Sequence, residues 1–270
     1  MQIGNNLTYT HSCAKTNFQQ SQNIQHSAPS FRGQINDNKK PNIFVRFNNY
    51  LDKKIGRFIL QTEYSSQYRS DKKLQSFSTN TPVLKAELAA YKYSVNAKYS
   101  DNYRLATATN SVLDDLHQKG YPLPQNVWSY DLDFDNSGYD FLKDIETSEK
   151  FGTCYPGKDT ISLNSGLKWG MMDFKMQEMH AQGITSSENP NHFILHQIGH
   201  FLQDNNNHEL ALDHDGIEFK NPEFIEKSVS KIAASNHNNF VAEVFAGKIS
   251  GKNYDETIMN MFKKFGGVFL

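Results

Sequence analysis

The spacing of hydrophobic residues changes near residue 122, and the change divides the chain into a helical part and a mixed part. Apolar residues recur every three or four positions on the N-terminal side, whereas short stretches after Pro122-Leu123-Pro124 alternate between apolar and polar residues. The helical spacing predicts helices near residues 41–58, 82–97, 101–119, 190–203, 221–234, 237–248 and 254–265. Strands are expected at residues 127–130 and 160–164. This order of elements predicts an α+β chain with a small sheet.

The same pattern predicts three regions. Residues 1–40 are polar and rich in Gln and Asn, which is typical of a disordered leader. Residues 41–119 form a helical N-terminal region that opens with a basic amphipathic helix, and such a helix either packs on its own domain or lies on a membrane. Residues 61–81 have the composition of a linker. The third region is residues 120–270, with a mobile loop rich in Met, Lys and Gln before the helix at 190–203.

Composition and charge exclude several classes of function. The net charge is −1 and the pI is about 6.8, so no global positive field favours nucleic acid. The two cysteines, Cys13 and Cys154, imply no disulfide framework. No apolar run is long enough for a transmembrane segment, and the N-terminus lacks the apolar core of a signal peptide. We expect a soluble protein that is cytoplasmic or exported by a signal-independent route.

The most informative motif is His196-Gln197-Ile198-Gly199-His200. It resembles H-E-x-x-H, in which two histidines on one helix face bind zinc and the glutamate acts as general base. The i,i+4 spacing predicts ring nitrogens of His196 and His200 within roughly 3–4 Å of each other. Gln197 stands at the base position, and an amide cannot take up a proton. His192, one turn earlier, is expected to be a polar rim residue.

A strand with the pattern I-x-L-N, the H-x-x-G-H helix and the later segment Phe240-Val241-Ala242-Glu243-Val244-Phe245 together resemble the catalytic domain of anthrax-lethal-factor-like zinc metallopeptidases. The resemblance covers residues 120–270. It implies a gluzincin, that is, a zincin-like domain with a small sheet and an active-site helix. It also implies that the strand around Ile161 is an edge strand that pairs with an extended substrate, and that His196 and His200 are zinc ligands.

Three chemical positions depart from that family pattern. The base position holds Gln197, the third-ligand position holds Asn239, and a tyrosine thought to support the transition state falls on Ile232. Glu243, one turn after Asn239, is either an alternative third ligand or a residue that holds a histidine from behind. Losing all three positions while the scaffold remains favours a degenerate enzyme.

The sequence therefore predicts a zinc-metallopeptidase-like protein that binds a polypeptide in a retained cleft without cleaving it. One alternative is an active zinc endopeptidase with Glu243 as third ligand and Glu188 or Glu209 as base. Another is a metal-free interaction module.

Three further groups of residues carry weaker hypotheses. The segment from Asp133 to Asp144 begins like a calcium-binding loop but fits an acidic hairpin better. A polar cluster after the motif helix is typical of a solvated turn, with a second metal as the alternative; its members are His208, Glu209, His214 and Asp215. Cys154 invites a nucleophile hypothesis, with a structural cysteine favoured.

Overall fold

The computed structural model describes residues 75–130, 151–213 and 219–270 together with part of the chain between residues 54 and 73. The chain divides into two compact units, Met1–Val45 and Arg46–Leu270, and all described residues belong to the second. Several predictions concern residues outside the described ranges. These residues are the expected leader, the acidic segment from Asp133 to Asp144, and His214 and Asp215. Most of the expected helix at 41–58 also lies outside them.

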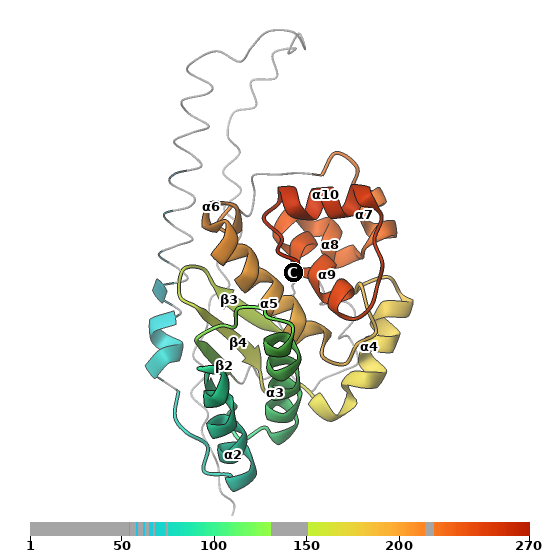
Figure 1. Ribbon diagram of the computed structural model, residues 1–270. Helices are drawn as coiled ribbons and strands as arrows, with labels where there is room; N and C mark the ends of the chain where they lie inside the picture. The colour runs from blue at the N-terminus through green and yellow to red at the C-terminus, as the bar shows by residue number, and fades with distance from the viewer. Residues whose placement is uncertain are drawn as a thin grey trace, which may run out of the picture. The chain divides into compact units, whose positions relative to one another are not determined.

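Four strands form a sheet of order β1-β2-β4-β3 (Figure 1). These strands are β1 Asn96–Lys98, β2 Asn126–Tyr130, β3 Gly152–Tyr155 and β4 Thr160–Asn164. The first three in spatial order run parallel, and β3 pairs antiparallel with β4 at the edge. The expectation that the strand around Ile161 is an edge strand is therefore wrong. Polar and apolar residues alternate along β4, a pattern that suggested a strand with one solvent-exposed face. All five residues of β4 are nevertheless buried, because the sheet is covered on both faces.

One face of the sheet is apolar and packs on helix α5, His192–Asn206. Ala97, Val127, Ile161 and Leu163 share this face by strand register and are fully buried. The opposite face contacts the segment expected to be a linker, and that expectation is wrong for residues 68–73, which are helical. The Tyr68 ring lies 5.1 Å from that of Trp128, and the Tyr155 hydroxyl donates to Asp71.

The helices before α5 differ from expectation in two places. Helix α2 spans Thr81–Ala90 and a 3-10 turn, η1, spans Tyr91–Tyr93; β1 follows where the expected helix 82–97 would have continued. Helix α3, Tyr103–Gln118, matches its predicted position. The expected loop before α5 instead contains η4, Trp169–Met171, and helix α4, Met172–Ala181. Helix α4 buries three methionines at helical spacing, namely Met172, Met176 and Met179.

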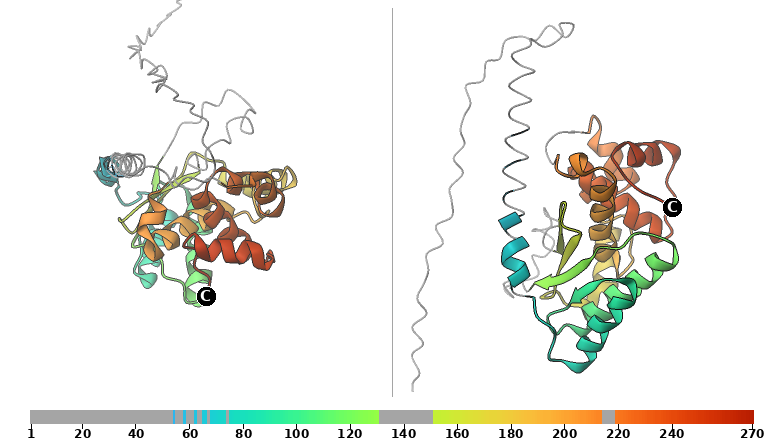
Figure 2. Two further views of the ribbon diagram at one scale, coloured as in Figure 1. Left: turned by 90° about the horizontal axis from the view of Figure 1, so that it is seen from above. Right: turned by 60° about the vertical axis from the view of Figure 1, so that its left-hand side comes forward.

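Helix α5 lies between the sheet and the C-terminal helices (Figures 1 and 2). These helices are α6 His208–Ala211, α7 Pro222–Ser228, α8 Lys231–Ser235, α9 His237–Ile249 and α10 Glu256–Lys264. The single helix expected at 221–234 is two helices because Ser230 adopts an extended conformation and caps α8 through its side chain.

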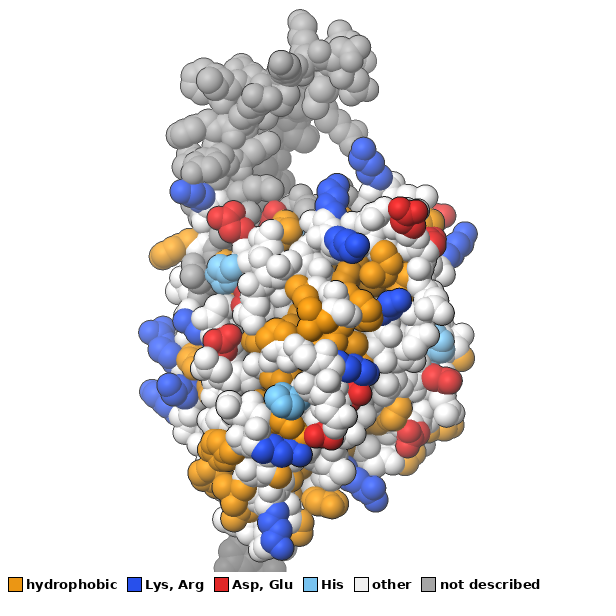
Figure 3. Space-filling model, viewed as in Figure 1, with side chains coloured by type: hydrophobic (Ala, Val, Ile, Leu, Met, Phe, Trp, Pro, Cys, Tyr) orange, Lys and Arg blue, Asp and Glu red, His pale blue; other side chains and the backbone are white. Residues whose placement is uncertain are grey.

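No helix in the described part of the chain combines the length and apolar character needed to cross a bilayer. On the face drawn in Figure 3, positive and negative side chains are interspersed, and neither sign forms a continuous patch.

Candidate metal centre

Helix α5 carries the histidine motif through the middle of the core. The Asn189 side chain accepts a hydrogen bond from the backbone N–H of Asn191, so Asn189 and Pro190 form a turn and the helix begins at His192. Ile194, Ile198 and Phe201, which share one face of the helix by their spacing, are buried, and Phe193 is buried beside them. The histidine side of the helix is also buried, because helix α9 covers it.

Helices α5 and α9 pack antiparallel and very close. Gln203 hydrogen-bonds Asn238 near one end of the contact, and His192 hydrogen-bonds Glu243 further along. Gly199 permits the approach, since a Cβ at this position would lie 2.8 Å from the Cα of Ala242. This packing sets the glutamate of α9 against the histidines of α5.

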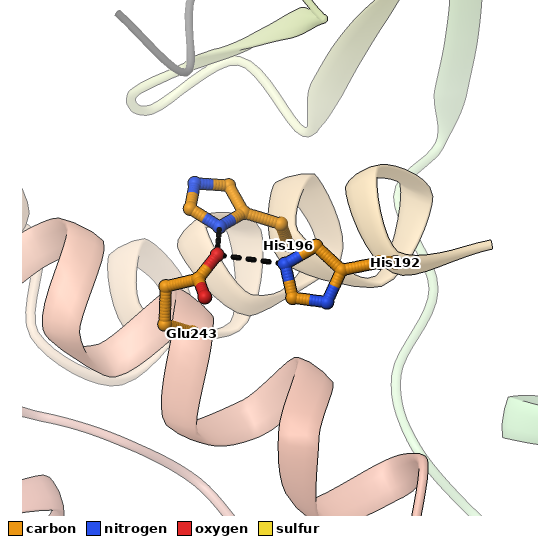
Figure 4. A group of neighbouring side chains, drawn as sticks. All are labelled: His192, His196 and Glu243. Carbon is orange, nitrogen blue, oxygen red and sulfur yellow. Dashed lines mark hydrogen bonds and ion pairs between the residues drawn. The ribbon is translucent and has the colours of Figure 1, made fainter. Parts of the chain in front are cut away.

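A single carboxylate oxygen of Glu243 meets two histidines (Figure 4). Oε1 lies 2.7 Å from Nε2 of His192 and 2.8 Å from Nδ1 of His196. Because an ionised carboxylate only accepts hydrogen bonds, both of these nitrogens must carry protons. All three side chains are fully buried. His192 is therefore part of the buried site, and the expectation that it lies at a polar rim is wrong.

The other nitrogen of His196 faces His200. The two Nε2 atoms lie 3.0 Å apart, which confirms the convergence that the i,i+4 spacing predicts. When His196 carries a single proton, on the Nδ1 that faces Glu243, its Nε2 presents a lone pair toward His200. His200 is only half-buried, so this pair of nitrogens lies at the more accessible end of the site.

The second oxygen of Glu243 is also fully engaged. Oε2 accepts from the backbone N–H of Ser186 at 2.8 Å and from the hydroxyl of Ser230 at 2.9 Å. Burial by itself raises the pKa of Glu243, but the charges and hydrogen bonds of His192 and His196 outweigh it and hold the pKa well below its ordinary value. Glu243 is thus an ionised, buried acceptor of four hydrogen bonds.

These residues could hold a metal ion in one of two ways. The ligand atoms of His192, His196 and Glu243 all lie within 4.8 Å of one another, so this buried group could bind an ion directly. In that case the ion would replace two hydrogen bonds to Glu243. Alternatively, the ion lies between the Nε2 atoms of His196 and His200, and Glu243 supports His196 from behind, as outer carboxylates commonly do for metal-binding histidines.

The structure places the three positions that depart from the family pattern in different surroundings. Gln197 is buried beside the edge strand, where a Cβ on Gly152 would lie 2.9 Å from its Cγ. Asn239 is half-buried, and its side-chain amide donates to the Ser235 hydroxyl. It lies one turn before Glu243, next to Asn238, which hydrogen-bonds Gln203 near the C-terminal end of α5. Ile232 is buried in the hydrophobic core.

The other candidate groups do not join this site. Burial raises the pKa of the Cys154 thiol well above its ordinary value, and nearby Asp204 and Asp159 add to the effect, which argues against a nucleophile. His208 instead pairs with Asp204, whose carboxylate also accepts from the backbone N–H of Gly157. The two proposed alternative bases, Glu188 and Glu209, are exposed.

Sequence reasoning assigned His192 to a polar rim and missed Ser186 and Ser230. The spacing H-x-x-x-H-x-x-x-H was visible and places all three histidines on one side of a helix. Nothing in the sequence indicates that the two serines meet Glu243, because they lie 57 and 13 residues away from it. The chain matches no protein-family model, no curated protein and no solved structure.

Proposed function

We propose that this chain is a metallopeptidase-like zinc-binding protein that binds an extended polypeptide without cleaving it. His196 and His200 hold the metal through their Nε2 atoms, and Glu243 orients His196. The observation that carries the proposal is the 3.0 Å approach of the two Nε2 atoms, combined with the bond from His196 Nδ1 to Glu243.

The donor set fits zinc. Two nitrogens at 2.0–2.1 Å from a tetrahedral ion lie about 3.3 Å apart, so the rings of His196 and His200 need only a small adjustment. Imidazole is a good zinc ligand, and a carboxylate behind it fixes the tautomer and raises its basicity. Bound zinc would polarise a peptide carbonyl or activate water. Gln197 cannot accept the proton of that water, so hydrolysis lacks its base.

Strand β3 supports the polypeptide part of the proposal. Among the described strands, it has a neighbour on one side only, and Gly152 at its start lies against Gln197. An unpaired strand edge offers a row of backbone groups to an extended peptide. A peptide on this edge would run past the Gln197 end of the histidine motif.

A second candidate function is a metal-free interaction module. It is favoured by the closed hydrogen-bond network, in which His200 can donate to His196, His196 to Glu243, and Ser187 contacts the remaining nitrogen of His192. Such a network is stable without an ion.

Zinc stoichiometry separates these candidates. We expect His196→Ala and His200→Ala to abolish zinc binding measured by elemental analysis after equilibrium dialysis, while His117→Ala, on an exposed position of α3, does not. Absence of zinc binding, or binding that is equal in all variants and therefore lies elsewhere, would rule out a zinc site on His196 and His200 and favour a site that works without metal. Chelator-sensitive cleavage of a peptide library by the unmodified chain would instead establish the active endopeptidase.

A further inference from the structure

Two neighbouring rows of side chains, on the face of the sheet that points away from α5, differ in their hydrogen bonding. In the first row, Asn96 donates to Asn126 and Asn126 donates to Thr160, so these bonds cross three strands. Two residues further along, Lys98 and Trp128 are directly paired in the strand register and are 6 % and 3 % exposed. Neither Lys98 Nζ nor Trp128 Nε1 has a hydrogen-bond partner in the described part of the chain. The second row therefore holds two buried donors without acceptors, which is rare in a folded protein.

The groups around Lys98 do not supply the missing acceptor. The buried Glu87 carboxylate attracts Lys98 through its charge, but its two oxygens already accept the backbone N–H groups of Tyr99 and Ser78. Burial lowers the pKa of Lys98, and the charge of Glu87 only partly opposes this effect. The ammonium group lies over the ring of Phe77, which is 47 % exposed. An aromatic face attracts an ammonium group but does not replace the oxygen acceptors that the group loses on burial.

Aromatic rings and further cations surround the Trp128 end of this row. The ring of Tyr68 lies 5.1 Å from that of Trp128. The Nζ atoms of Lys72 and Lys158 lie 5.9 Å and 5.8 Å from the centre of the Tyr68 ring. The acid on the same helical segment, Asp71, accepts from the Tyr155 hydroxyl. The two free donors are thus bordered by flat apolar surface and by positive charge.

The chemistry of the free donors selects the kind of ligand. An ammonium group and an indole N–H only donate hydrogen bonds, so the ligand must offer acceptor atoms. A carboxylate accepts from an ammonium group in a charge-assisted bond, which is about twice as strong as a neutral one. Adjacent strands lie about 4.8 Å apart, close enough for the two oxygens of one carboxylate to accept from both side chains. The rings of Tyr68 and Trp128 suit a flat apolar body attached to that carboxylate.

We propose that Lys98 and Trp128 form a binding site for a small aromatic carboxylate. Lys98 binds the carboxylate through its charge and a hydrogen bond, and the indole N–H of Trp128 fixes its orientation. Phe77, the exposed ring over Lys98, is the group that the ligand displaces. Lys98 ends β1, and ligands commonly bind at the carboxyl ends of parallel strands. The proposal does not depend on a metal ion, because α5 and its histidines lie against the other face of the sheet.

The test uses the full chain, labelled with heavy nitrogen and titrated with sodium benzoate in nuclear magnetic resonance experiments. The chain has two tryptophans, so the spectrum contains two indole N–H signals, and Trp128→Phe assigns them. We expect the Trp128 signal to shift as its N–H gains an acceptor. Trp169 already donates to the carbonyl oxygen of Asn164, so its signal should stay in place. Benzamide has the same shape without the charge and should bind about 10–150-fold more weakly, the value of one charge-assisted hydrogen bond.

A matched pair of lysine variants separates binding from folding. Lys98→Met keeps the size of the side chain and should weaken benzoate binding about 10–150-fold. It should also raise the Tm of the free protein, because an ammonium group buried without acceptors is destabilising. Lys85→Met, at an exposed position of α2, should change neither quantity.

Three results would overturn the proposal. A Trp128 signal that does not respond to benzoate would exclude the site. Equal binding of benzamide and benzoate would exclude an anionic ligand. A Lys98→Met protein that is less stable than the wild type, or that does not fold, would show that the ammonium group is a structural contact and has no free donor for a ligand.

Discussion

Gly199→Ala should separate helices α5 and α9 and thereby damage the fold and the metal centre together. The added Cβ would lie 2.8 Å from Cα and 3.2 Å from the carbonyl oxygen of Ala242. Ordinary contact begins near 3.4 Å, so the helices must move apart by about 0.6 Å. The obstructing atoms are backbone, and no side-chain rotation can relieve the overlap.

The magnitude follows from two opposing effects. Alanine in place of glycine favours a helix by about 1 kcal/mol. Overpacking of a core contact typically costs 1–3 kcal/mol, and a gap of 0.5–1 Å forfeits a quarter to a half of the dispersion attraction across an interface. Because backbone meets backbone at Gly199, we expect the upper end of that cost and a net loss of about 2 kcal/mol in the free energy of unfolding.

Denaturation by urea or by heat measures the loss of stability, and zinc competition measures the loss of metal affinity. A loss of about 2 kcal/mol corresponds to a fall of about 4–8 °C in Tm for a chain of this size. Moving α9 also lengthens the bond from Glu243 to His196, and weakened outer support typically lowers metal affinity 10–100-fold. Gly170→Ala is the control, since its Cβ meets nothing within 4 Å and should change stability by less than about 0.5 kcal/mol. An unchanged or more stable Gly199→Ala protein would refute the close helix contact.

Three other predictions concern the site. The pKa of Glu243 is lower in the folded protein than its ordinary value of 4.5, so its ionised form stabilises the fold above pH 4.5. This contribution is lost as the pH falls through the pKa of the folded state. Urea denaturation at several pH values should therefore show that the free energy of unfolding falls more steeply with acid in the wild type than in Glu243→Gln. His200→Ala should abolish zinc binding and lower the free energy of unfolding by less than about 1 kcal/mol, because the His200 ring is half-buried. His192 is fully buried, so His192→Ala should lower the free energy of unfolding by about 2–4 kcal/mol. Denaturation curves measure both changes. Gln197→Glu alone should yield no peptide cleavage, whereas Gln197→Glu with Asn239→Glu should bind zinc more tightly and give measurable cleavage in a chelator-controlled assay.

Local patterns predicted most helices and both strands on which the motif argument depended. Strands β2 and β4 and helices α3, α5, α9 and α10 lie close to their expected positions because each has a clear period or cap. The errors came from segments whose partners are distant in the chain. Helix α4 hides a methionine stripe among Lys and Gln, and β1 is only three residues long and takes its place by pairing with β2.

The candidate site was only partly predictable for the same reason. Helical spacing was enough to bring His196 and His200 together, because both lie on one element. The role of Glu243 depended on which side of α9 faces α5, and the sequence left that open. His192 looked superfluous as a third ligand on one straight helix, yet a carboxylate from another helix gives it a partner.

Glu243 and Gln197 differ in what each contributes to folding. Glu243 satisfies four buried donors, so replacing it would destabilise the protein whether or not metal is present. Gln197 is different. It is buried against β3, and a glutamate there would carry the desolvation cost of a buried charge. The amide fills this buried position without that charge, so Gln197 stabilises the fold at the expense of a general base.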